Sequence, residues 1–125
     1  RLRNNHLILN RLNKVNLKTI KVKHGNVKSN CFIINKKLAY ISDVNEIYNK
    51  DYKYFKNLEY LIIDCLRYNF HPSHFNLESV LNLINLFKPK KSILTNLHTD
   101  LDYNVLKNRL PKNVVPAYDG LSINF

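Results

Sequence analysis

The chain has 125 residues, of which 45% are hydrophobic, and it carries only two glycines, four prolines and a formal net charge of +11 at pH 7. This composition suits one domain or part of one, and it excludes a linker or a low-complexity chain. No apolar run approaches the roughly 20 residues that a membrane-spanning helix needs, so we expect no membrane partner and a cytoplasmic protein. The charge allows an anionic partner, but lysines scattered as singles and pairs favour a solvated surface.

The cysteines indicate the redox environment of the protein, and the first residues indicate whether the chain is a fragment. Cys31 and Cys65 lack CxxC spacing and lie in apolar runs, so both are expected to be buried thiols that need no oxidising compartment. The chain contains no methionine and opens on Arg1-Leu2-Arg3 without a start signal. We therefore expect that it was trimmed or that it is one fragment of a longer protein.

The first part of the chain predicts an antiparallel sheet. Residues 1–16 have no clean period and are expected to form a poorly defined N-terminal segment, ahead of an ordered unit over residues 17–125. Strands are predicted over residues 17–23, 30–35 and 38–42, the first with apolar and charged residues in alternation. Their links are too short for crossover helices, so the three strands should form an antiparallel meander.

The second part of the chain alternates between predicted helices and strands. Residues 45–56 have irregular helical spacing, and residues 58–66 are apolar on both faces, as in a central strand. Asn76 is expected to cap a helix that Pro89 ends. The remaining predicted elements are a strand at Ile93-Leu94, a helix over residues 103–110, and a hairpin of strands 114–118 and 121–123 around Asp119-Gly120. This order indicates an α/β fold with a mixed sheet.

Polar residues occur at the ends of three of the predicted strands. His24 ends the first strand, Asp43 ends the third, and His98 follows the strand that begins at Lys91. Two imidazoles and a carboxylate are a ligand set for zinc, manganese or iron, and a carboxylate between two imidazoles can bridge two metals around a reactive water. Three ligands alone make an open site. The alternative is that these are scattered polar residues of surface loops.

Three further polar residues have two interpretations each. His71 and His74 flank a loop that begins at Pro72, and one of them could protonate a leaving oxygen as a general acid. Alternatively, they pack at the start of the following helix. Asp64, near the end of the central strand, is at least as well explained as the cap of a turn as by a catalytic role.

Six stretches, in this order, resemble the motifs of metallo-β-lactamase-fold hydrolases. The branch they are most similar to is the cyclic phosphodiesterase of phosphonate breakdown and its bacterial relatives. The stretches are residues 22–25, 38–44, 61–68, 71–78, 93–103 and 117–120. The resemblance covers nearly the whole chain from about Thr19 onward. It implies half of an αββα sandwich, the C-terminal half, with a mixed sheet and helices on one face.

The resemblance also implies roles for individual residues. His24 matches a metal-binding histidine, Asp43 the aspartate that bridges two metals, and His74 a histidine near the substrate phosphate, a candidate general acid. The last metal histidine of the family usually follows a Leu-Thr pair directly, where this chain has Asn96. His98, two residues later, looks like its substitute.

The family's histidine-rich HxHxDH loop is absent from these 125 residues. We therefore expect the C-terminal fragment of a metal-dependent hydrolase of phosphodiester type, using zinc or manganese, acting on a phosphodiester small molecule or a nucleotide, and inactive alone. A half-fold should leave one sheet face exposed for an N-terminal half or a second copy. The alternative is a non-catalytic remnant or a basic interaction module that binds nucleic acid or a partner chain. A cysteine hydrolase would need an exposed, activated thiol, which neither cysteine suggests.

Overall fold

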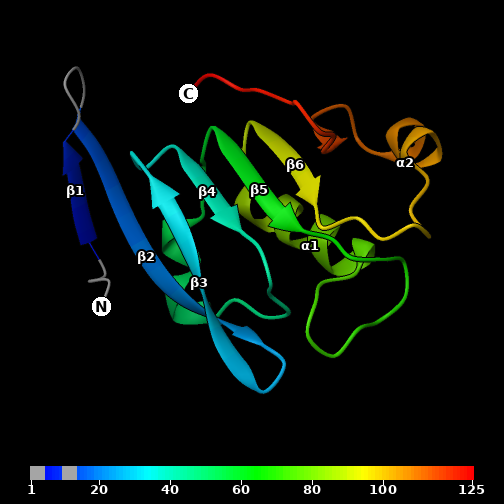
Figure 1. Ribbon diagram of the computed structural model, residues 1–125, viewed down its shortest axis with the longest axis horizontal. Helices are drawn as coiled ribbons and strands as arrows, with labels where there is room; N and C mark the ends of the chain where they lie inside the picture. Colours follow the sequence, from blue (N-terminus) through cyan, green and yellow to red (C-terminus); the bar gives the residue numbers. More distant parts are fainter. Residues whose placement is uncertain (1–4, 10–13) are drawn as a thin grey trace.

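The computed structural model describes residues 5–9 and 14–125, which form one seven-stranded sheet with helices beside it (Figure 1). The strands lie in the sheet in the order in which they occur along the chain. The elements are β1 (Asn5–Leu9), β2 (Lys14–His24), β3 (Val27–Ile34), β4 (Leu38–Ile41), the 3₁₀ helix η1 (Asn49–Tyr54), β5 (Tyr60–Asp64), α1 (Leu77–Phe87), β6 (Lys91–Thr95), α2 (Tyr103–Arg109) and β7 (Val114–Pro116).

The first four strands form an antiparallel meander, which confirms the prediction for β2, β3 and β4. The turn between β2 and β3 contains Gly25 at a φ of +59°. The link between β3 and β4 is equally short, and Asn35 and Lys36 take φ angles of 53° and 55° there. Such short turns leave no room for a crossover, so each strand must reverse direction.

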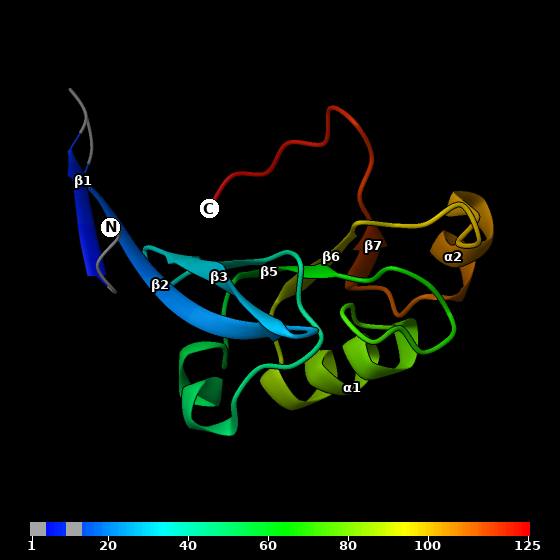
Figure 2. The same ribbon diagram turned by 60° about the horizontal axis from the view of Figure 1, so that its bottom comes forward.

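The last four strands run parallel, because a helical segment connects each to the next. η1 lies between β4 and β5, α1 between β5 and β6, and α2 between β6 and β7. Figure 2 shows η1 and α1 on the same face of the sheet, while α2 lies beyond β7 at its edge. The sheet is therefore mixed, with its main helices on one face, as the sequence predicted.

The hydrophobic core lies between the sheet and the face of α1 and η1. Phe55 and Phe87 are completely buried there, with ring centroids 5.5 Å apart. The Asn76 side chain accepts a hydrogen bond of 2.9 Å from the Ser79 amide and starts α1, as predicted. Lys88, at a left-handed φ of 53°, ends the helix just before Pro89.

The face of the sheet opposite α1 carries partly exposed apolar side chains. Register places Phe32 of β3 beside Tyr40 of β4, and Tyr40 beside Ile62 of β5. Alternation directs this row away from the buried row of Ile33, Ala39 and Leu61. Tyr40 remains 41% exposed and the Phe32 and Ile62 side chains are half-buried.

The two ends of the chain differ from the sequence-based predictions. The hairpin predicted over residues 114–123 is wrong: the turn forms, with the Leu121 amide donating to the Tyr118 carbonyl at 3.0 Å, but residues 121–125 form no strand. β7 is three residues long and ends at Pro116, which has no N–H to donate, so it offers little for a further strand to pair with. In the segment 1–16, residues 5–9 form β1, whereas residues 1–4 and 10–13 lie outside the described part. No helix in the described part is long and apolar enough to cross a membrane.

Candidate metal centre

Three side chains from distant parts of the chain meet at one rim of the sheet. His24 is the last residue of β2, Asp43 follows β4, and His74 lies in the loop before α1. Each offers one ligand atom, and these atoms all lie within 4.8 Å of one another. The His24 and His74 rings meet edge to face, with their centroids 4.8 Å apart. Two imidazoles and a carboxylate are therefore close enough to act on the same ion or ligand.

The His24 ring is oriented by the loop that carries His74. Its Nδ1 lies 2.6 Å from the Ser73 carbonyl oxygen. Because a carbonyl only accepts, Nδ1 carries the proton and donates, which leaves the Nε2 lone pair available as a ligand. Gly25 makes this approach feasible, since a Cβ there would lie 3.1 Å from the Ser73 Cβ.

The His74 ring is oriented in the same way by a buried carboxylate. Nδ1 of His74 lies 2.6 Å from Oδ2 of Asp64, the last residue of β5. Asp64 is fully buried, and its oxygens also accept from the Val44 amide at 3.1 Å and from Nδ2 of Asn96 at 3.2 Å. These donors compensate the burial of its charge. Nε2 of His74 is again the nitrogen left for a ligand.

Asp64 thus connects the two loops that carry Asp43 and His74. Val44, whose amide it binds, follows Asp43 directly in the chain. Asp43 has a left-handed φ of 54°, which an aspartate tolerates better than most residues, and its carbonyl accepts from Oγ of Ser29 at 2.6 Å. Its side chain is exposed at the rim.

The donor set fits a divalent cation. In tetrahedral coordination two atoms that are each about 2.1 Å from one zinc lie about 3.4 Å apart, so a pair at the 4.8 Å limit must close by about 1.4 Å for direct binding. The same separations also suit an arrangement in which an oxygen of a ligand lies between the ion and one side chain. A hydrogen-bond acceptor at Nδ1 of each metal-site histidine is the usual outer contact in such sites.

The sequence predicted His24 and Asp43 as ligands and His74 as an acid, and the structure brings these three together. His98 lies outside the group. Its half-exposed ring instead accepts from the Asp100 amide at 3.3 Å within its own loop. The chain turns at Asn96, where φ is 58°, and Asn96 takes the place beside Asp64.

Two other predicted groups are also located. Nδ1 of His71 accepts from the Ser73 amide at 3.2 Å, and desolvation, followed by the positive charge of Arg67, lowers the pKa of His71 below its ordinary value. Burial raises the pKa of both cysteine thiols to about 12, so neither is a nucleophile at neutral pH.

The sequence favours a turn-capping role for Asp64 at least as strongly as a catalytic one, whereas the structure shows it orienting His74. A carboxylate at the end of a strand that is apolar on both faces is itself a signal of such a role, because a buried carboxylate must find hydrogen-bond donors.

A hollow of about 470 Å³ borders this rim. It is lined in part by Asn96, which binds Asp64, and by Tyr118, which is 56% exposed. The Tyr118 ring packs edge to face on Tyr103 of α2, with the centroids 6.3 Å apart. None of His24, Asp43 and His74 lines the hollow, which is connected to His74 through the Asn96–Asp64 contact.

Comparison with solved structures shows close similarity of fold. A diphosphatase from the PhnP family is 24% identical, with a TM-score of 0.90 over 100% of this chain and 48% of its own. The metallo-β-lactamase fold protein YhfI from Bacillus subtilis is 14% identical, with a TM-score of 0.75 over 96% of this chain and 53% of its own. Zinc-bound PqqB from Methylobacterium extorquens is 11% identical, with a TM-score of 0.67 over 89% of this chain and 50% of its own.

The chain therefore spans about half the length of these structural neighbours. No protein-family model and no curated protein matches its sequence. At these identities the likeness establishes the fold alone.

Proposed function

We propose, from the premise that this chain has the metallo-β-lactamase fold over about half of its neighbours' length, that it is the C-terminal half of a metal-dependent hydrolase of phosphodiesters. The proposal depends on one observation, the convergence of His24, Asp43 and His74 with both imidazoles held at Nδ1. Oriented ligands at the rim of a sheet, beside a hollow, are what metal-assisted hydrolysis requires.

Within this proposal, His24 and Asp43 hold the ion, with further ligands from an N-terminal half. A divalent ion bound there would supply a Lewis acid and an activated water. The zinc of the similar PqqB supports zinc, and manganese is the second candidate because imidazole and carboxylate ligands suit both. His98 is not needed for this ligand set.

His74 has a different role, as the proton donor to the leaving oxygen. Asp64, 2.6 Å from Nδ1, fixes the ring so that Nε2 faces the leaving oxygen, and its carboxylate would stabilise the imidazolium form that gives up the Nε2 proton. Separations of up to 4.8 Å would leave room for a substrate oxygen between a bound ion and Nε2. The neighbouring hollow would hold the rest of a small phosphodiester or nucleotide, and the PhnP-family diphosphatase supports a phosphorus substrate.

The apolar sheet face is the proposed contact for the missing half. Phe32, Tyr40 and Ile62 form a row there that is only partly buried. An N-terminal half that carries the HxHxDH loop would cover it, and a second copy of the chain is the alternative partner. Both cysteines are unpaired, which agrees with the expected cytoplasmic location.

The proposal is tested by mixing this chain with a separately produced N-terminal half of the same fold that carries an HxHxDH loop, and assaying bis(p-nitrophenyl) phosphate in Mn²⁺ or Zn²⁺. We expect no hydrolysis by either piece alone and hydrolysis by the mixture. His24→Ala and Asp43→Asn should each abolish the activity of the mixture, because each removes a ligand. His74→Asn should lower kcat by about 10²–10⁴-fold, as expected for loss of a general acid.

The matched control is His98→Ala, which should leave the rate within about twofold, because His98 lies outside the group. Ultracentrifugation of each mixture shows whether the pieces associate. An associated mixture without hydrolysis would contradict the catalytic proposal and leave a non-catalytic remnant. A mixture inactivated only by His98→Ala would contradict the assignment of ligands.

A further inference from the structure

Two adjoining hollows lined by lysines lie where β2 passes η1, on a part of the surface that shares no residue with the candidate metal centre. One has a volume of about 280 Å³ and contains Lys18, Lys21, Lys28 and Lys50 in its lining. The other has a volume of about 680 Å³ and contains Lys18, Lys36, Lys53 and Lys56. Lys18 and Tyr54 belong to both, so the hollows form one continuous region, here named the β2–η1 surface.

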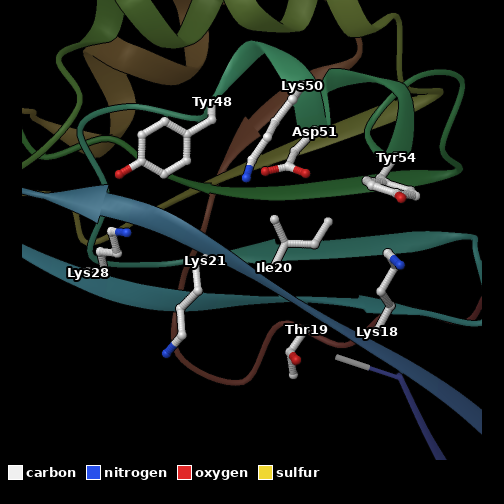
Figure 3. A pocket seen from close by; sticks show the side chains of 9 residues that line it. All are labelled: Lys18, Thr19, Ile20, Lys21, Lys28, Tyr48, Lys50, Asp51 and Tyr54. Carbon is white, nitrogen blue, oxygen red and sulfur yellow. The ribbon is translucent and has the colours of Figure 1, made fainter. Parts of the chain in front are cut away.

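The charge of the β2–η1 surface is predominantly positive. Asp51 is the sole acidic residue among those lining the two hollows, against seven lysines. Figure 3 shows Lys50 and Asp51 on η1 and Lys21 and Lys28 on the strands on the other side of the hollow, with the Lys21 ammonium group pointing away from η1. One carboxylate cannot balance seven ammonium groups, so the surface has a net positive charge.

Tyr54 holds two of these charges in place where the hollows meet. The Lys18 and Lys53 ammonium groups lie 4.2 Å and 5.1 Å from the centroid of its ring. Cation–π contacts of this kind restrict long side chains that would otherwise sample many rotamers. Two cations are therefore prepositioned at the centre of the surface, which reduces the entropy lost when they bind an anion.

The shape and chemistry of this surface favour one class of ligand. Membrane binding would use protruding apolar side chains, but none of the lining residues is among the exposed large hydrophobic residues of the described ranges. A rigid duplex cannot enter hollows of this size, whereas a flexible single strand can follow them. The Tyr54 ring is covered by ammonium groups, so the contacts would be to phosphates and not to bases.

We propose that the β2–η1 surface binds the phosphodiester backbone of single-stranded nucleic acid without reading its sequence. This site is separate from the metal centre and needs no metal. The lysines supply the affinity through release of counterions, so binding weakens steeply with salt. The chain would then have a nucleic-acid contact whether or not the hydrolase proposed above is active.

The test measures fluorescence anisotropy of a labelled 12-nucleotide oligo(dT) with the metal-free protein across a salt series. The test variant carries Lys50→Gln, Lys53→Gln and Lys56→Gln. We expect it to lose at least about tenfold in affinity at moderate salt, and the slope of log K against log salt to become shallower by about 2, or about 0.7 for each lost contact. Thermal melting followed by circular dichroism verifies that the variant folds.

The matched control removes the same charge elsewhere, with Lys90→Gln, Lys107→Gln and Lys112→Gln. It should lose less than about threefold and keep the slope of the unmodified protein. Equal losses in both variants would overturn the proposal, because they would reflect net charge alone. No salt-dependent binding by the unmodified protein would also overturn it, as would tighter binding to anionic vesicles or inorganic polyphosphate than to the oligonucleotide.

Discussion

Replacing Asp64 by alanine should lower the free energy of unfolding by about 3–5 kcal/mol. The fully buried carboxylate accepts from Val44, His74 and Asn96, and the substitution leaves these three donors without their acceptor. Each unsatisfied buried group costs about 1–3 kcal/mol, partly recovered where the loops open to water. Urea unfolding followed by circular dichroism measures the change.

Two further variants distinguish the role of Asp64 from the general effect of removing a carboxylate. Asp100→Ala removes a carboxylate that is 60% exposed and 3.3 Å from a histidine, so it should change the free energy of unfolding by less than about 0.5 kcal/mol. Asp64→Asn keeps the shape but not the charge, so the Nδ1–H tautomer of His74 should lose its preference in ¹⁵N NMR spectra. Equal destabilisation by Asp64→Ala and Asp100→Ala would contradict the central place of Asp64.

Phe87→Ala is the second large effect that we expect, a loss of about 3–5 kcal/mol in the free energy of unfolding. The ring is completely buried at the end of α1. It stacks on Phe55 and meets the Tyr52 ring edge to face at 5.1 Å, so it joins α1 to η1. Truncation removes these contacts and leaves a cavity that the packed sheet cannot close. Thermal and urea unfolding both report it.

The neighbouring residue supplies the control. Leu86 is 47% exposed on the same helix, so Leu86→Ala should change the free energy of unfolding by less than about 1 kcal/mol. If the two alanine variants unfolded at the same urea concentration, the core would not lie between α1 and the sheet as described.

Much of the fold could be predicted because its signals are local. Short links between β2, β3 and β4 force an antiparallel meander, and Asn76 and Pro89 mark the limits of α1. The final hairpin was mispredicted because Asp119-Gly120 is a genuine turn, but pairing depends on the partner strand, and β7 ends at Pro116. A turn motif alone does not report whether a partner strand has donors to offer.

The site was less predictable because its contacts are distant in sequence. The strand ends at His24 and near Asp43 could be found from alternation, and the structure places both at one rim. Nothing in the local sequence indicates that Ser73 contacts His24, 49 residues away. The same holds for Asn96, whose bond to Asp64 spans 32 residues and whose left-handed turn leaves His98 outside the group.

We expect His24 and Asp43 to hold a divalent ion, with His74 facing it. The most direct measurement is anomalous diffraction at the zinc edge from crystals grown with excess ZnCl₂. One dominant peak should appear about 2.0–2.2 Å from Nε2 of His24 and from a carboxylate oxygen of Asp43. A dominant peak at His98 and Asp100, or none within reach of His24 and Asp43, would contradict it.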